Sequence, residues 1–326
     1  MAPALENNET LVQSPSYKVL VTGGAGYIGT TLVEMLLQRH HKVTVFDSFR
    51  FGAAGLFHLV HHENLSLVNG DILNKKQLAE VMHGQDVIYH LAGIVGFPAC
   101  EKNPKLATDV NIHGTQNVID CLTPAQKIIF ASTGSCYGAV EGICTEETQL
   151  NPLTLYGTSK LEGENMVKSA NGIALRLATL FGVAPRLRMD LLVNFFVLLA
   201  HSGENIKLYQ SHFKRTFLHV KDACRAFVLA MDKYDEMKGQ CFNVGDEKMN
   251  LTKLELTQLV QECIPTLKYE LCDDGEDLDQ RNYEVSYKKI KSLGFTSKYS
   301  LKHGIQELHK VCMGMTQEDI DRAKNV

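Results

Sequence analysis

From Lys18 onward, short apolar runs alternate with segments that have the periodicity of amphipathic helices. Parallel strands need long crossover connections, so this alternation predicts a Rossmann-type α/β fold, a doubly wound parallel sheet with helices on both faces. The predicted strands are KVLVTGG from Lys18, KVTVFD ending at Asp47, LSLVNGD ending at Asp71, DVIYHLA ending at Ala92, KIIFAST ending at Thr133, and GIALRLA over 172–178. One predicted helix follows Gly29, and three others cover 75–82, 104–121 and 156–168.

The alternation changes after Phe181. We expect helices over 189–200, 220–231 and 301–313, a strand in QCFNVGD from Gln240, and a helix LTKLELTQLVQEC that Asn250 caps. The pattern predicts a first domain over 18–180, with returning segments near 217–246. A smaller, interleaved α/β lobe is expected over 181–326, and residues 1–17 are interpreted as a flexible tail.

Charge and cysteine content exclude several classes of protein. The 326 residues include 33 basic and 37 acidic side chains, so no broad positive field is expected for nucleic acid or an anionic membrane. No apolar run approaches the roughly 20 residues that a membrane span needs, and the first 17 residues do not resemble a signal peptide. Nine cysteines without a C-x-x-C pair favour reduced thiols, which predicts a cytoplasmic protein.

A glycine cluster follows the first predicted strand and precedes a helix. Its glycines at 23, 26 and 29 are spaced G-x-x-G-x-x-G, one residue wider than the dinucleotide fingerprint. Without Cβ atoms, the backbone amides at a helix N-terminus can approach a pyrophosphate. We expect cofactor contacts from Gly23, Gly26, Tyr27, Ile28 and Gly29; the alternative is an ordinary tight turn.

Acidic residues end the next two predicted strands. Asp47 lies 18 residues beyond Gly29, where a carboxylate would accept hydrogen bonds from a ribose diol and repel a 2′-phosphate. This favours NAD over NADP, although Arg50 lies close enough to weaken the preference. Asp71, followed by Ile72, is placed to face the adenine. The alternative for Asp47 is a turn residue at a strand end.

Tyr156 and Lys160 form an i,i+4 pair if YGTSK opens a helix. An ammonium stabilises a nearby phenolate and lowers the pKa of a phenol, which is ordinarily about 10. Such a phenol can accept or return a hydroxyl proton while a hydride moves to nicotinamide. The hydroxyls of Ser132 and Thr133, at a predicted strand end, are placed to hold the same substrate oxygen.

At this point the sequence resembles the extended short-chain dehydrogenase/reductase family, in its nucleotide-sugar epimerase/dehydratase branch. The resemblance runs from Lys18 to Met313. It rests on TGGAGYIG, Asp47, GDI at 70–72, HLAG at 90–93, Asn111 with Gly114-Thr115, STGSCYG from Ser132, YGTSK, and RTFLHVKD from Arg215.

The resemblance implies an NAD-dependent enzyme that transiently oxidises a sugar hydroxyl, usually at C4. Tyr156 would be the base, Lys160 its electrostatic partner and a ribose ligand, and Thr133 the residue that orients the hydroxyl. Further NAD contacts would come from Leu91, Ala92, Gly93 and Asn111. A UDP- or GDP-linked sugar would be held by Ser135, Arg186, Arg188, Asn194, Arg215 and Arg281. Each arginine could instead belong to a surface ion pair.

One departure from the family pattern narrows the expected reaction. Sugar 4,6-dehydratases of the family place Asp-Glu directly after the threonine, and decarboxylases typically carry Glu at the second position. This chain has Gly134-Ser135 there, so no acid is available for a leaving hydroxyl. We expect a nucleotide-sugar 4-epimerase, with a C4 dehydrogenase or 4-keto reductase as alternatives. A 4,6-dehydratase and a non-catalytic dinucleotide sensor are disfavoured.

Four further stretches are similar to bacterial enzymes that act on nucleotide-activated sugars, including a GDP-heptose C4 dehydrogenase. These stretches are LAGIVGFPAC from Leu91, CTEET from Cys144, RLATLFGVAPRLRMDLLVN from Arg176, and GEDLDQRNYEVSYKKIKSLGF from Gly275. The family resemblance also implies a homodimer formed through 104–121 and 156–168.

Several other polar residues carry weaker signals. We expect no metal site, because His58, His61 and His62 lack acidic or cysteine partners at metal-site spacing. Cys136 is interpreted as a small buried hydrophobe, and Asp222 as a helix cap.

Overall fold

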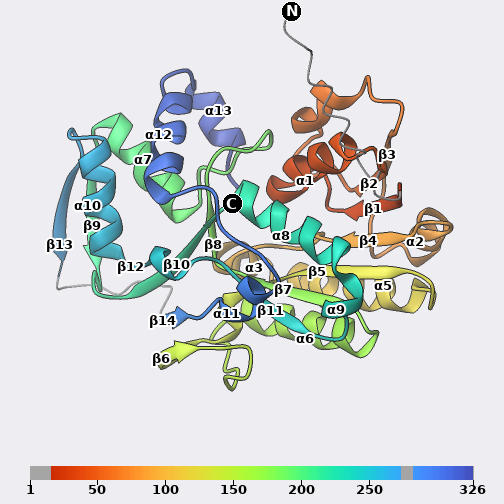
Figure 1. Ribbon diagram of the computed structural model, residues 1–326. Coiled ribbons are helices and arrows are strands. Elements are labelled where there is room, and N and C mark those ends of the chain that lie inside the picture. The colour runs from red at the N-terminus through yellow and green to blue at the C-terminus, as the bar shows by residue number, and fades with distance from the viewer. Residues whose placement is uncertain (1–15, 273–281, 326) are drawn as a thin grey trace, which may run out of the picture.

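The computed structural model describes residues 16–272 and 282–325, and its centre is a seven-stranded sheet (Figure 1). The strands follow the order β3–β2–β1–β4–β5–β7–β11, and every neighbouring pair is parallel. This confirms the predicted Rossmann-type α/β fold. The strands are β1 (Lys18–Thr22), β2 (Lys42–Asp47), β3 (Leu65–Asn69), β4 (Val87–His90), β5 (Lys127–Thr133), β7 (Ile173–Leu177) and β11 (Cys241–Val244).

Helices cover both faces of this sheet, because successive side chains of a strand point to opposite faces. Val19 and Val21 pack into one hydrophobic core, whereas Leu20 packs into another. Figure 1 shows the first face covered by α1 (Tyr27–Gln38) and α8 (Val220–Asp232). The second face is covered by α2 (Lys75–Met82), α5 (Thr115–Cys121) and α6 (Leu155–Ser169).

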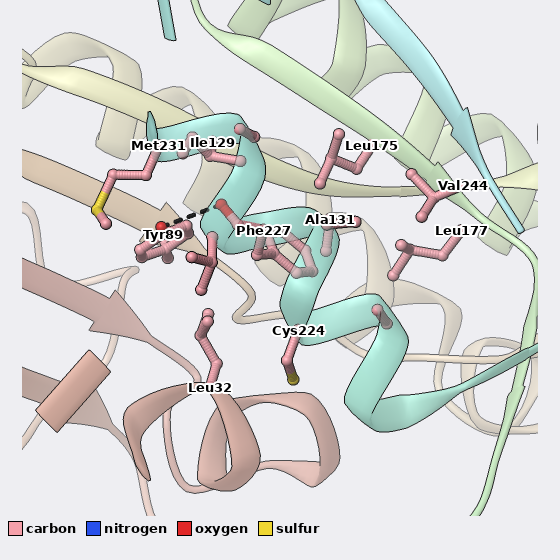
Figure 2. Packing of buried hydrophobic residues seen from close by; sticks show 14 of the residues in the cluster. Leu32, Tyr89, Ile129, Ala131, Leu175, Leu177, Cys224, Phe227, Met231 and Val244 are labelled. Carbon is pink, nitrogen blue, oxygen red and sulfur yellow. Dashed lines mark hydrogen bonds between the residues drawn. The ribbon is translucent and has the colours of Figure 1, made fainter. Parts of the chain in front are cut away.

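The core under α8 joins the most distant parts of the chain. Figure 2 shows Phe227 of α8 beside Tyr89 and Ala131 of the sheet, whereas Cys224 points toward α1, where its thiol contacts the Ile28 backbone oxygen at 3.5 Å. Tyr89 of β4 donates a hydrogen bond to the backbone oxygen of Phe227 at 3.1 Å. Residues 220–244 therefore return to the first domain to complete its sheet and one of its faces.

The second lobe has its own hydrophobic core, formed around Phe196, Phe217, Leu256 and Ile305. Its strands are β8 (Thr179–Phe181), β10 (Lys214–His219) and β12 (Asn250–Thr252) in one sheet, and β9 (Asn205–Tyr209) and β13 (Lys268–Cys272) in another. Its helices are α7 (Leu192–Ser202), α10 (Lys253–Cys263), α12 (Leu301–Cys312) and α13 (Gln317–Arg322).

Short elements connect these parts. They are η1 (Ala54–Leu59), α3 (Phe97–Lys102), α4 (Pro104–Thr108), η2 (Asp109–Gly114), η3 (Gly134–Cys136), β6 (Ala139–Cys144), α9 (Tyr234–Met237), η4 (Glu247–Met249), β14 (Asn282–Val285) and α11 (Lys288–Ser292). Strands β6 and β14 pair in parallel beside the carboxyl end of β5. The segment η2 is π-helical and joins α4 to α5 without a gap, so the helix expected over 104–121 is confirmed and contains a π-helical turn.

Two predicted helix caps are wrong. Thr252 rather than Asn250 caps α10, through a capping box with Glu255, because Asn250 is already paired in β12. His219 caps α8, whereas the Asp222 carboxylate accepts hydrogen bonds from the backbone nitrogens of Lys298 and Tyr299. Asp222 therefore ties the segment before α12 to the first domain.

Several predicted boundaries also differ. The second-lobe helix expected from Met189 begins at Leu192, and two predicted strands end two residues early, at Asn69 and His90. The interpretation of residues 1–17 as a flexible tail lies largely outside the described residues. Within the described residues, every helix is too short or too polar to cross a lipid bilayer. All nine cysteines are free thiols.

Candidate active site

A cavity of about 470 Å³ opens where the central strands end. The carboxyl ends of parallel strands meet at one edge of a sheet, so residues far apart in the chain share its walls. It brings together most of the residues predicted from the sequence. These are Gly23, Gly26, Tyr27, Ile28, Gly29, Asp47, Arg50, Asp71, Ile72, Leu91, Ala92, Gly93, Thr133, Ser135, Tyr156, Lys160, Arg186 and Arg188.

The glycine turn forms one wall and fits a dinucleotide. Gly23 has a φ of +71°, and a Cβ there would stand 2.6 Å from the backbone nitrogen of Ala92. A Cβ on Gly29 would stand 2.6 Å from the backbone oxygen of Gly23. Helix α1 follows with no side-chain cap and no acidic residue in its first turn. A helix N-terminus of this kind suits a pyrophosphate.

Asp47 lies at the end of β2, beside the glycine turn. Its carboxylate accepts hydrogen bonds from the backbone nitrogens of Ala25 at 3.0 Å and Phe49 at 2.8 Å. Burial raises the pKa of Asp47 above its ordinary value, and these two hydrogen bonds oppose that rise. The carboxylate thus has a fixed orientation at the position where a ribose diol is expected.

Thr133 ends β5 on the opposite wall. Its hydroxyl accepts a hydrogen bond from the backbone nitrogen of Ser135 and donates one to the Ser135 hydroxyl, both at 3.1 Å. Ser132 also lines the cavity, and its hydroxyl donates a hydrogen bond to the buried carboxylate of Glu164 at 2.8 Å. Thr133 and Ser135 are therefore the hydroxyl pair at this strand end.

Helix α6 carries Tyr156 and Lys160 into the same cavity. The Thr154 side chain caps the helix by accepting a hydrogen bond from the backbone nitrogen of Gly157 at 3.1 Å. A Cβ on Gly157 would stand 2.9 Å from the Ser135 backbone oxygen, so this glycine lets α6 approach the Thr133–Ser135 turn.

Lys160 is 4% exposed, and its Nζ lies 4.1 Å from the centroid of the Phe130 ring. Burial lowers the pKa of Lys160 to about 8. Between pH 8 and 10.5, Lys160 is therefore protonated in the unfolded chain but largely neutral in the folded protein. Below pH 8 it is charged in both states, and burying this charge lowers the free energy of unfolding.

Replacing Lys160 by Met should raise the free energy of unfolding of the cofactor-free protein at pH 7 by about 1–3 kcal/mol, because about 1.4 kcal/mol accompanies each pKa unit. The gain should shrink as pH rises from 8 to 10.5, where the native lysine is neutral. Urea titrations at pH 7 and 10 measure both effects, with exposed Lys76→Met as the control. A variant less stable than the wild type at pH 7 would contradict the assigned cost of burial.

Asn111 and His90 lie behind the cavity wall. The Asn111 amide accepts a hydrogen bond from the Ile94 nitrogen at 2.7 Å and donates to Ser159 at 3.1 Å. Burial lowers the pKa of His90 to about 3, and its neutral ring bridges Thr22 and Thr115. Asn111 therefore positions the segment after Gly93; it is not among the residues that line the cavity.

The six predicted substrate residues are divided by the structure. Ser135, Arg186 and Arg188 line the cavity, and Arg188 pairs with Asp190 through contacts of 3.1 and 2.6 Å. Asn194 is fully buried and donates to the Arg188 backbone oxygen at 2.8 Å, so it shapes the segment over 182–188. Arg215 is 3% exposed and donates to the Lys214 backbone oxygen. Arg281 lies outside the described residues.

The cavity also contains residues that the sequence analysis missed. Thr179 is a hydroxyl just after a strand of the central sheet, the same signal that identified Thr133, and could have been found. Leu191, Tyr283 and Asn325 come from distant segments and carry no local pattern. Only the folding of the second lobe onto the sheet brings them to this cavity.

Other candidate centres have no supporting geometry. No group of three or more His, Cys, Asp or Glu side chains within the described ranges could hold a metal ion. Cys136 is fully buried, and burial raises the pKa of its thiol to about 12.

Known proteins with similar sequences include nucleotide-sugar enzymes of several kinds. A putative UDP-glucose 4-epimerase from Methanocaldococcus jannaschii is 27% identical over 311 residues, which cover 89% of this chain and 96% of that protein. A UDP-N-acetyl-alpha-D-glucosaminuronate decarboxylase from Bacillus cytotoxicus is 29% identical over 248 residues, 71% of this chain and 75% of that protein.

Solved structures show the same fold. A UDP-glucose 4-epimerase from Thermotoga maritima, solved with UDP-glucose, has a TM-score of 0.78 and 25% identity, covering 91% of this chain and 98% of that chain. A UDP-glucuronic acid 4-epimerase from Bacillus cereus, solved with UDP-glucuronic acid and NAD, has a TM-score of 0.81 and 23% identity, covering 91% and 99%. Residues 19–245 match the NAD dependent epimerase/dehydratase family. This matched range contains the glycine turn, Asp47, Thr133, Tyr156 and Lys160. The chain therefore belongs to the NAD-dependent epimerase/dehydratase family.

Proposed function

We propose that this protein is a 4-epimerase of a nucleoside-diphosphate sugar and keeps NAD bound through the reaction. The observation that carries this proposal is the shared cavity. Thr133, Tyr156 and Lys160 line it together with the glycine turn and Asp47, and strands β4 and β1 lie between the strands that end at Thr133 and Asp47. A sugar hydroxyl beside Tyr156 would then lie next to the nicotinamide end of a dinucleotide that begins at Asp47.

NAD held by the glycine turn and Asp47 would supply the hydride acceptor and donor for C4 of the sugar. The Tyr156 phenolate takes the proton from the C4 hydroxyl and gives it back when the ketone is reduced. The charged Lys160 stabilises that phenolate within a low-dielectric wall, and the Thr133 hydroxyl orients the substrate oxygen. All three groups serve both directions of the reaction.

The lack of an acidic residue at the two positions directly after Thr133 favours epimerisation over elimination or decarboxylation. Gly134 and Ser135 follow Thr133, and neither has a carboxyl group. Among the described residues that line the cavity, the carboxylates are Asp47 and Asp71, which follow β2 and β3 rather than β5. Loss of a hydroxyl needs a second proton donor, and these two side chains are on the cofactor side.

We propose that the sugar nucleotide contacts Ser135 and Arg188 from the cavity wall, with Arg281 as a further diphosphate ligand. Forked guanidinium donors suit phosphate oxygens. Relatives and solved neighbours with UDP-sugar names make a UDP-linked substrate the first choice, and a GDP-linked one the alternative.

Product analysis tests the reaction. The purified protein is incubated with UDP- and GDP-linked hexoses, and the products are followed by NMR and by absorbance at 340 nm. An epimerase converts the sugar to its C4 epimer without net NADH formation. A released 4-keto sugar with equimolar NADH would instead identify a C4 dehydrogenase, and consumption of NADH by a 4-keto sugar a reductase. Nucleotide binding without turnover would identify a dinucleotide sensor.

We further propose that the protein is a cytoplasmic homodimer. The implied interface uses the exposed sides of α4, α5 and α6, which pack against one another on the second face of the sheet. Gel filtration with light scattering measures the mass, and a monomer at micromolar concentration would contradict the dimer.

A further inference from the structure

The C-terminal end of the chain reaches the cofactor cavity. After α13, the backbone oxygen of Ala323 accepts a hydrogen bond from the Met189 nitrogen at 2.7 Å, and Asn325 lines the cavity itself. Figure 1 shows α13 on the side of the second lobe that faces α1. Asn325 thus belongs to the cavity wall, and Ala323 ties the segment before it to Met189.

This part of the wall lies at the Asp47 end of the cavity. The Arg186 guanidinium lies 4.5 Å from the centroid of the Phe51 ring, and its Nη2 donates to the Lys324 backbone oxygen at 3.5 Å. Phe51 follows Asp47 in the loop after β2, and Arg186 and Asp47 attract each other electrostatically. Asn325 directly follows Lys324, so it lies on the adenosine side of the site.

Close packing fixes the position of Arg186. Its backbone nitrogen donates to the Thr30 hydroxyl in α1 at 3.3 Å. A Cβ on Gly55 would stand 2.9 Å from that same nitrogen, so the loop after β2 and the segment over 182–188 touch. The Arg186 backbone is therefore fixed against α1 and η1.

Asn325 and Arg186 both have unused hydrogen-bonding capacity. The Oδ1 atom of Asn325 is buried and has no hydrogen-bond partner within the described part of the chain. Arg186 is 7% exposed, and the described residues give its guanidinium a single hydrogen bond, to Lys324. Burying an amide oxygen without a partner is costly, which points to a ligand as the missing donor.

We propose that Asn325 and Arg186 are ligands of the adenosine half of NAD, so that the C-terminal end of this chain completes the cofactor site. The Asn325 oxygen accepts a hydrogen bond from adenosine, whose donors are the adenine amine and the ribose hydroxyls. A side-chain amide pairs well with adenine, which presents an amine donor beside a ring-nitrogen acceptor. Arg186 provides donors to the ribose and its phosphate beside Asp47. The inference needs NAD in this cavity but does not depend on which sugar reaction follows.

Calorimetric titration of the nucleotide-free protein with ADP and with NAD⁺ tests the proposal. Asn325→Ala should raise both Kd values about tenfold, as expected for the loss of one hydrogen bond, and should leave the melting temperature unchanged. Lys324→Ala is the matched control, because it removes the neighbouring side chain but keeps the backbone oxygen that accepts from Arg186. It should leave both Kd values within twofold.

Two cofactor analogues locate the contact. Nicotinamide hypoxanthine dinucleotide lacks the adenine amine, and 2′-deoxy-NAD⁺ lacks one ribose hydroxyl. The tenfold effect of Asn325→Ala should disappear for the analogue that lacks the contacted group. For Arg186→Met, ADP affinity should fall about tenfold while affinity for UDP stays within twofold.

Three results would overturn the proposal. The first is an ADP affinity of Asn325→Ala within twofold of the wild type. The second is a loss of ADP affinity in Lys324→Ala equal to that in Asn325→Ala. The third is a loss of UDP affinity rather than ADP affinity in Arg186→Met. Because ADP binding requires no sugar and no turnover, failure of the 4-epimerase assay leaves this test intact.

Discussion

Replacing Tyr156 by Phe is expected to lower kcat for the sugar nucleotide by about 10²–10⁴-fold, the usual contribution of a positioned acid–base group. In the proposed mechanism the Tyr156 phenol exchanges a proton with the C4 hydroxyl, and Tyr156 and Thr133 line the same cavity. The substitution keeps the ring that shapes the wall, so the Kd for NAD⁺ should stay within twofold. Product NMR at saturating substrate gives kcat, and calorimetry gives the Kd.

Tyr269→Phe is the control for this prediction. Tyr269 lies in β13 and packs against the core of the second lobe, away from the cavity. Its turnover should match the wild type. A Tyr156→Phe enzyme with at least one third of wild-type kcat would show that another group moves the proton, and the mechanism would fail.

The second large effect concerns the buried ion pair that holds α6 to the sheet. Arg176 of β7 makes two hydrogen bonds to the Glu164 carboxylate, at 2.6 and 3.0 Å, and both residues are almost completely buried. The Ser132 hydroxyl donates a hydrogen bond to the Glu164 carboxylate, and the Arg176 guanidinium donates one to the Tyr137 hydroxyl. Glu164→Gln leaves the Arg176 guanidinium in the core without a counter-charge, which should cost about 3–5 kcal/mol of unfolding free energy.

This effect should depend on pH. Burial disfavours the ionised form of Glu164, but the hydrogen bonds and charge of Arg176 outweigh it and hold the pKa of Glu164 below its ordinary value. The unfolded chain therefore binds the proton more readily, and the stabilisation is fully present above about pH 4.5 and is lost as pH falls through the folded-state pKa. Wild type and Glu164→Gln should differ most at pH 7 and approach each other in acid.

Urea unfolding at pH 7 and pH 4 measures both quantities. The exposed pair of Lys75 and Asp120, with an Nζ to Oδ2 distance of 2.6 Å, supplies the control. Asp120→Asn should change the free energy of unfolding by less than about 1 kcal/mol at either pH. An equally small loss for Glu164→Gln at pH 7 would mean that the buried pair contributes little.

Much of the first domain could be predicted from the sequence because its signals are local. The range predicted for KIIFAST, 127–133, matches β5, and the helix predicted over 75–82 matches α2. Boundaries shifted where tertiary pairing decided them, as at Asn250, which pairs in β12 instead of capping α10. The helix expected over 104–121 contains a π-helical turn where Asn111 bonds to Ile94 and Ser159.

The sequence alone predicted the parallel sheet, the glycine turn, and four residues that share the cavity wall, Asp47, Thr133, Tyr156 and Lys160. Strand alternation, glycine spacing and an i,i+4 pair are properties of short segments, and parallel strands place their carboxyl ends at one edge. Only the tertiary structure separated Asn194 and Arg215 from the cavity, placed Arg186 near Asp47 and brought Asn325 into the cavity wall. These placements depend on how the second lobe packs onto α1, and no residue spacing within a segment encodes a contact between residues more than 130 positions apart.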